Sequence, residues 1–234
     1  MNPARAVSGD LMAERDKYKT QLPDYTRGEE IANTVTHIIG GIFAVLAIPL
    51  LIVTAVRHND PWAVVSGAVY GATLLIMFTV SSVYHGLKPG KLKRIMRVID
   101  HCDIYLLIAG TYTPILLVAV RPINPDVAWS VFAVEWALAI VAIILNAIDL
   151  KRFEKISMVC YIGMGWCVLA ILKVTIEAMT QSGFVLLLLG GIAYTVGAAL
   201  YGIGKRVRYI HTAFHVFVLL GSVLQFLAIL LYVM

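Results

Sequence analysis

Charged side chains are scarce in this sequence: Asp, Glu, Lys and Arg together make up 14% of its 234 residues, against about a quarter in an ordinary soluble domain. Hydrophobic residues make up 60%, and the mean hydropathy is +0.84. A chain of this size cannot bury so much apolar surface in a water-soluble core. In a bilayer each backbone N–H and C=O must pair within the protein, so only helices or closed barrels can span it. The apolar runs are long and do not alternate with polar residues, which predicts helices.

Cysteine is also scarce. Cys102, Cys160 and Cys167 lie inside or at the ends of apolar segments and show no pairing pattern, so we interpret them as small reduced hydrophobic residues. The first thirty residues are polar and lack the apolar stretch of a secretory signal, so no cleavable signal peptide is expected.

The apolar segments are long enough to cross a membrane, which takes about 20 residues each. Short loops rich in turn-forming and charged residues separate them. We therefore predict an all-α, polytopic membrane protein in which a polar cytoplasmic tail over 1–27 precedes a seven-transmembrane-helix domain over 28–234. The predicted spans lie near 31–56, 62–87, 98–120, 127–149, 156–179, 184–203 and 210–233.

The positive charges indicate the orientation of this bundle. With seven spans, nearly all Lys and Arg residues fall on one side of the membrane, and the other side holds only Arg57 and Arg121. The positive-inside rule then places the N-terminus in the cytoplasm and the C-terminus outside. This is the reverse of the arrangement of G-protein-coupled receptors. The net charge of +5 is accounted for by topology, and no nucleic-acid partner is expected.

Ionisable side chains inside a membrane are costly, so their recurrence suggests function. Ser81 and His85 lie one helical turn apart near the predicted cytoplasmic end of the second span, and His211 and His215 are spaced in the same way at the start of the seventh. Asp100 and Asp103 begin the third span at a matching depth. In the first span Glu30, Asn33 and His37 also lie toward the cytoplasmic end. His101, beside Asp100, is the fifth histidine at this depth, and the sixth, His58, falls in a loop and receives no role.

These residues favour a metal site. A single histidine near a helix end is usually only hydrogen-bonded, but two histidines one turn apart can reach one Zn²⁺ ion, and His85 at equal depth supplies a third ligand. Three ligands leave an open position for water, as in catalytic zinc sites. Asp100 would then act as base and later as acid, and Ser81 could orient the water or polarise a carbonyl group.

The same motifs resemble those of the progestin and adipoQ receptor family, whose bacterial branch is named hemolysin III. Glu30-x-x-Asn33-x-x-x-His37 is similar to the first family motif, Ser81-x-x-x-His85 to the second and His211-x-x-x-His215 to the last. The stretch from Asp100 to Pro114 resembles the third span of the family. The resemblance covers about residues 28–234.

The resemblance implies that His85, His211 and His215 bind zinc, that Asp100 contacts the water held there, and that Ser81 lies close to it. Because the family is grouped with alkaline ceramidases and related membrane hydrolases, it also implies hydrolysis of a lipid amide or ester. Asp103 is a second carboxylate that departs from the receptors of this family.

Our first hypothesis is therefore an integral membrane, zinc-dependent, ceramidase-like hydrolase with an inner-leaflet site and a membrane lipid as substrate or ligand. The alternatives are a membrane sensor or homeostasis factor with a non-catalytic metal site, and an ion or proton transporter. A pore-forming toxin is disfavoured because such proteins need segments that convert from soluble to inserted. The short loops favour a bacterial inner membrane. Separately, Glu135 and Lys173 are expected to form a buried ion pair, with Glu177 as an alternative partner for the lysine.

Overall fold

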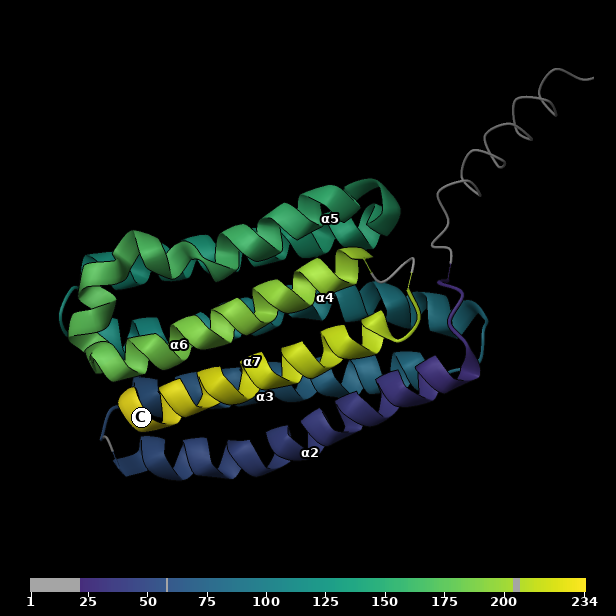
Figure 1. Cartoon of the computed structure of the whole chain (residues 1–234). Coiled ribbons are helices and arrows are strands. Elements are labelled where there is room, and N and C mark those ends of the chain that lie inside the picture. The colour runs from purple at the N-terminus through teal and green to yellow at the C-terminus, as the bar shows by residue number, and fades with distance from the viewer. Residues whose placement is uncertain (1–21, 58, 204–206) are drawn as a thin grey trace, which may run out of the picture.

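The computed structural model describes residues 22–57, 59–203 and 207–234, and all regular structure within them is helical. Residues 1–21 of the predicted tail lie outside this part of the chain, as does His58. The helices, labelled in Figure 1, are α2 (Arg27–Arg57), α3 (Pro61–Gly86), α4 (Lys91–Pro114) continued by the π-helix η1 (Ile115–Val120), α5 (Pro125–Gly165), the 3₁₀-helix η2 (Cys167–Ile171), α6 (Leu172–Ile203) and α7 (Ile210–Tyr232).

Local sequence explains where several helices begin. Asp60 and Asn124 precede α3 and α5, and each side chain accepts a hydrogen bond from a backbone N–H of the first turn. Both helices then have proline in their first turn, where a missing N–H costs nothing.

Five helical stretches are long and apolar enough to cross a membrane. One of them, Pro125–Ile203, runs for 79 residues through α5, η2 and α6. Its backbone leaves the helical conformation at Asp149 (φ −158°, ψ 95°) and at Thr180 (φ 64°, ψ 165°). Both interruptions coincide with the ends of predicted spans, at 149 and at 179. The count of seven spans and the sidedness of the termini remain predictions.

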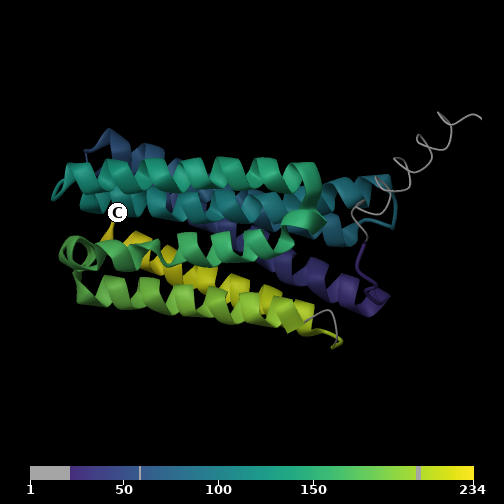
Figure 2. The ribbon, with the colours of Figure 1, turned by 90° about the horizontal axis from the view of Figure 1, so that it is seen from above.

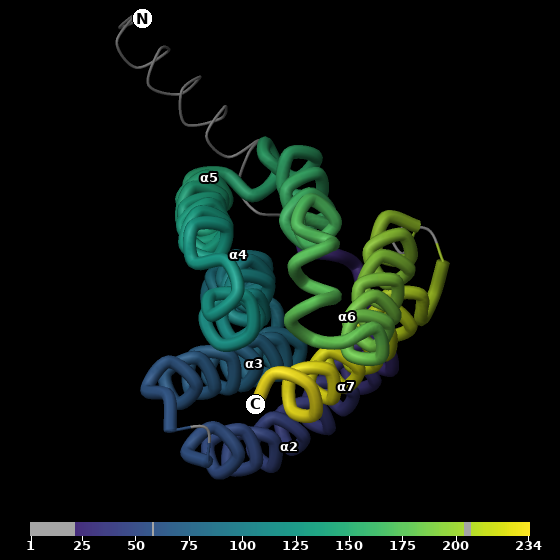
Figure 3. Tube along the Cα trace, turned by 90° about the vertical axis from the view of Figure 1, so that its left-hand side faces the viewer, coloured from purple at the N-terminus to yellow at the C-terminus, as the bar shows by residue number. Residues whose placement is uncertain are grey.

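The helices form one elongated bundle in which they run side by side along the long axis (Figures 1 and 2). α2 packs against α3 and α7, α3 against α4, α4 against α5, and α6 against α7, as the end-on view in Figure 3 shows. Large apolar side chains such as Ile42, Leu46 and Val53 on α2 point outward. An outer surface of this kind suits lipid rather than water.

This packing brings four helix ends together. α2, α4 and α7 begin, and α3 ends, at the same end of the bundle, on the right in Figure 1. We call it the histidine end, because it contains the histidines of the candidate site.

The predicted ion pair between Glu135 and Lys173 is wrong. The Lys173 side chain is exposed, whereas Glu135 is 1% exposed and neither of its carboxyl oxygens has a hydrogen-bond partner among the described residues. The thiol of Cys167 lies near this carboxyl group but outside hydrogen-bond geometry. The prediction rested on the equal depth of the two residues in the membrane. The rotation of each helix about its own axis, which depth does not determine, points their side chains to different surroundings.

Candidate metal centre

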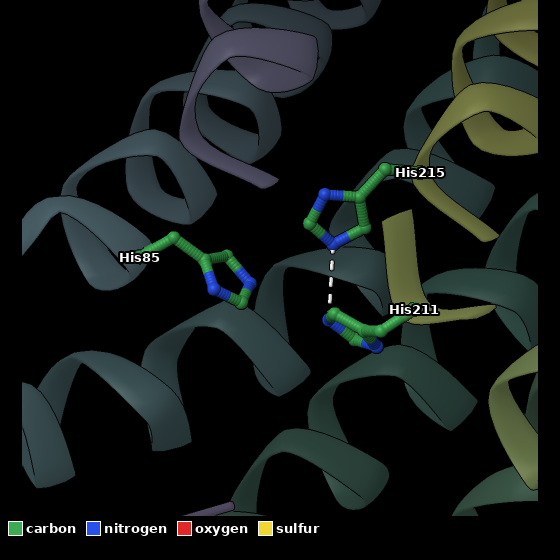
Figure 4. A group of neighbouring side chains, drawn as sticks. All are labelled: His85, His211 and His215. Atoms are coloured by element: carbon green, nitrogen blue, oxygen red, sulfur yellow. Dashed lines mark hydrogen bonds between the residues drawn. The ribbon is translucent and has the colours of Figure 1, made fainter. Parts of the chain in front are cut away.

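Three buried histidines meet at the histidine end. His85 comes from the last turn of α3, and His211 and His215 come from the first turns of α7. One ligand atom from each lies within 4.8 Å of the other two. Nε2 of His211 and Nε2 of His215 are 3.1 Å apart, and the three rings surround one central space (Figure 4). The sequence prediction that these side chains converge agrees with the geometry.

The spacing of the ring nitrogens fits a metal ion. Nitrogens that bind a tetrahedral Zn²⁺ at about 2.0–2.1 Å lie about 3.4 Å from each other, which is close to the separation found between His211 and His215. Nε2 of His85 is buried and has no hydrogen-bond partner among the described residues. An unpaired imidazole nitrogen in an apolar setting is costly unless something binds it. The triad could therefore hold a metal ion.

Glu30 fixes the orientation of His85. Its Oε2 lies 2.7 Å from Nδ1 of His85, and its Oε1 accepts a 2.6 Å hydrogen bond from Nζ of Lys93. Because a carboxylate only accepts, Nδ1 of His85 carries the proton and Nε2 is left with its lone pair free. Metal-binding histidines are commonly oriented by a carboxylate in this way.

Lys93 was not anticipated as a site residue, because its charge was counted only as a sign of topology. It is 3% exposed and also donates to the backbone carbonyls of His85 and Leu87. These three contacts tie the start of α4 to the end of α3 and hold Glu30 from the second side.

Asn33 joins α2 to α7 beside the triad. Its backbone carbonyl lies 3.3 Å from Nδ1 of His215, which leaves Nε2 of that ring facing the centre. Its side-chain oxygen accepts a 2.6 Å hydrogen bond from the hydroxyl of Thr212. Through these bonds one residue of α2 sets the position of the first turn of α7.

Glu29 makes a second connection between the same two helices. Thr26 and Glu29 form a capping box at the start of α2, in which Oε2 of Glu29 accepts from both the amide and the hydroxyl of Thr26. Oε1 of Glu29 accepts a 2.9 Å hydrogen bond from the backbone N–H of Tyr209, the residue before α7. The spacing Thr-x-x-Glu was a signal available in the sequence.

Tyr25 covers the triad from the histidine end. Its ring stacks on His211 with a centroid distance of 5.0 Å and an angle of 24°, and lies 5.9 Å from the ring of His85. Burial raises the pKa of its phenol, which therefore stays neutral. Nothing in the local sequence distinguished this tyrosine from an ordinary interfacial one.

His37 lies next to the triad without joining it. Its ring centroid is 3.8 Å from that of His215, it is buried, and neither ring nitrogen has a hydrogen-bond partner among the described residues. The prediction that it supports the site is compatible with this placement.

A cavity of about 170 Å³ extends from His211 and His215 of the triad into the bundle. Its polar lining at the histidine end includes Ser81, Asp100, Asp103, His211 and His215. It reaches Gln225 of α7, which is about 15 Å beyond His215 at the α-helical rise. The deeper wall is mainly apolar, with Ile115, Leu187 and Val218 among its residues.

The two residues predicted to be catalytic line this cavity. Oδ2 of Asp100 lies 3.8 Å from Nδ1 of His101, and Asp100 does not belong to the group of ligand atoms within 4.8 Å of one another. Ser81 is buried one turn before His85. Any action of Asp100 on an ion at the triad would therefore be indirect.

Comparison with known proteins shows which family this chain matches. The family described as "Haemolysin-III related" matches residues 25–226. The chain is 41% identical over 215 residues to "Hemolysin-3" of Bacillus cereus, covering 92% of this chain and 96% of that protein. It is 37% identical over 208 residues to the "Hemolysin-3 homolog" of Bacillus subtilis strain 168, covering 89% and 96%.

A human protein is also similar. The chain is 27% identical over 210 residues to "Monocyte to macrophage differentiation factor" of Homo sapiens, covering 86% of this chain and 83% of that protein. The membrane-spanning helices and the bacterial relatives confirm an integral membrane protein of the bacterial plasma membrane. The chain belongs to the haemolysin-III-related family, which confirms the resemblance to the progestin and adipoQ receptor family and its bacterial branch.

Proposed function

We propose that this chain is a zinc-dependent hydrolase of a lipid amide or ester, ceramidase-like, with its site at inner-leaflet depth. The observation that carries the proposal is the cavity, which joins His211 and His215 of the triad and Asp100 at one end to a deep apolar wall at the other. Ligand sites are typically apolar clefts with a few polar groups that fix orientation. A lipid whose polar linkage lies at the histidine end and whose acyl chain fills the apolar end matches this lining.

His85, His211 and His215 would hold the ion, each through the nitrogen that faces the common centre. Bound Zn²⁺ would polarise the substrate carbonyl and make water a better nucleophile at neutral pH. The carboxylate of Asp100 would take a proton from the attacking water and pass it to the leaving amine or alkoxide. The hydroxyl of Ser81 would hold the carbonyl oxygen or the water, and Tyr25 would help to exclude bulk water.

Turnover of defined lipids tests this proposal. We would reconstitute the full chain in nanodiscs with N-acyl and O-acyl lipids and measure released fatty acid by mass spectrometry. Turnover should stop on chelation, return with Zn²⁺, and fall at least about 100-fold in Asp100→Asn, the typical contribution of a general base. The exposed Asp126 provides a matched control, because Asp126→Asn should retain activity. Zinc-loaded protein with no turnover on the full lipid panel would overturn the proposal.

The covering of the triad by Tyr25 favours a second candidate, a membrane sensor that binds lipid without turnover. A ring stacked on His211 must move before a bulky headgroup can reach the triad from that side. In a sensor, Asp100→Asn should leave lipid binding and signalling unchanged. Loss of both with zinc retained would contradict this alternative.

A further inference from the structure

Asp103 is a buried carboxyl group that the proposed chemistry does not use. It is 1% exposed, and neither oxygen has a hydrogen-bond partner among the described residues. Its side chain lines the same cavity as Asp100, His211 and His215. Buried polar groups without partners are rare because leaving them unpaired costs stability. The side chain is therefore suited to accept a partner from within the cavity.

Asp103 lies one turn deeper in the cavity than Asp100. The cavity-lining residues of α4 recur at spacings of three and four, so they share one face of the helix. Three residues correspond to about 4.5 Å along the axis. A ligand with its reacting carbonyl beside Asp100 would extend its acyl chain past the third carbon before reaching the level of Asp103, so a hydroxyl group on the third carbon would lie within hydrogen-bond reach of that carboxyl group. Further in, Leu107 and Ile108 line the cavity, and they suit plain methylene groups.

The lining also selects the kind of partner. Arg97 and His101 line the cavity near the two carboxyl groups, so part of the attraction of a cationic amine to these carboxyl groups would be offset by repulsion from the guanidinium group. A hydroxyl group avoids this repulsion and can donate to a carboxyl oxygen. An unsubstituted acyl chain would leave Asp103 unpaired, and sites built to bond a hydroxyl reject analogues that lack it.

We propose that Asp103 is a specificity-determining residue that accepts a hydrogen bond from a hydroxyl on the third carbon of the acyl group. The preferred substrates would then be 3-hydroxyacyl amides or esters. Hydrolysis of these lipids rests on the proposed function, whereas their recognition by Asp103 requires only that they bind.

Binding of free acids to the full chain in nanodiscs tests the recognition without turnover. Tetradecanoate, 2-hydroxytetradecanoate and 3-hydroxytetradecanoate would each be titrated by calorimetry. Wild type should bind the 3-hydroxy acid on the order of 10-fold tighter than the plain acid, as expected for one additional hydrogen bond to a buried carboxyl group. In Asp103→Leu this preference should fall within about twofold, because no acceptor remains. Asp103→Asn should keep part of it, since an amide oxygen also accepts.

Thr111 provides the matched control on the same face of α4. It lines the cavity, but its hydroxyl already donates to the carbonyl of Leu107 at 2.7 Å, so Thr111→Val should keep the preference. Equal affinity of wild type for the three acids would overturn the proposal, as would a preference that survives in Asp103→Leu. A preference for the 2-hydroxy acid would also overturn it.

Hydrolysis assays with 3-hydroxyacyl and plain acyl lipids separate this inference from the proposed function. Turnover without discrimination would overturn the role of Asp103 and leave the hydrolase intact. Discrimination in binding without any turnover would support recognition by Asp103 and overturn the hydrolase. An equal loss of kcat on both lipids in Asp103→Asn would assign Asp103 to proton transfer and contradict the proposal.

Discussion

Replacing Glu30 by glutamine should weaken metal binding without unfolding the bundle. The carboxylate accepts from Nδ1 of His85 at 2.7 Å and from Nζ of Lys93 at 2.6 Å. A glutamine has one acceptor oxygen for these two donors, and its NH₂ group would face the other. Lys93 keeps its bonds to two backbone carbonyls, so the turn between α3 and α4 should persist.

The size of the effect follows from the role of Glu30 in orienting His85. Without the carboxylate, His85 can rotate or change tautomer, and its Nε2 no longer faces the centre with a free lone pair. Loss of such an orienting group typically lowers metal affinity about 10- to 100-fold, which corresponds to about 1.4–2.7 kcal/mol. Direct loss of a ligand in His85→Ala should lower the metal affinity further.

Competition with chelators of graded affinity, followed by metal analysis of the purified protein, would measure the change. Glu177 is an exposed carboxylate on α6, and Glu177→Gln should bind zinc like wild type. If Glu30→Gln binds zinc within about twofold of wild type while His85→Ala does not bind it, the proposed role of Glu30 is wrong.

Three further substitutions test the packing by thermal melting in detergent. Gly40→Ala should destabilise by about 1–3 kcal/mol, because its methyl group would overlap the buried ring of Phe78, whereas Gly41→Ala has open space; equal melting of the two variants would refute this reasoning. Glu29→Gln should cost about 1–2 kcal/mol through the charge-assisted bonds lost at the start of both α2 and α7, and an unchanged melting temperature would show that this connection is unimportant. Glu135→Leu should melt at or above the wild-type temperature, since it removes an unpaired buried carboxyl group; a clear drop would mean that the carboxyl group has an unrecognised partner.

The helical period made the centre of the site predictable. Residues four apart share a helix face whatever the surroundings, so the pairing of His211 with His215 and their common depth with His85 could be read from spacing. The interruptions at Asp149 and Thr180 also coincide with the ends of predicted spans. Periodicity therefore predicts depth and face within one helix.

Contacts between helices could not be predicted from the sequence in the same way. The rotation of a helix about its own axis depends on packing against its neighbours, which is why depth alone paired Glu135 with Lys173 wrongly. The burial of Lys93 was missed for a related reason, since a basic residue beside a helix end is usually solvated. The cover formed by Tyr25 depends on the path of an irregular segment, for which the sequence has no periodic signal.

The division of the histidine triad between α3 and α7 has a consequence for biogenesis. The ribosome delivers α3 to the membrane early, whereas His211 and His215 follow only with the last described helix. A chain still being synthesised therefore lacks two of the three histidines, and could not hold an ion at the proposed centre while its other helices insert. Under the proposed function, loading would wait until α7 has docked beside α2, and a nascent chain that stalls or is cut short before α7 would lack the site.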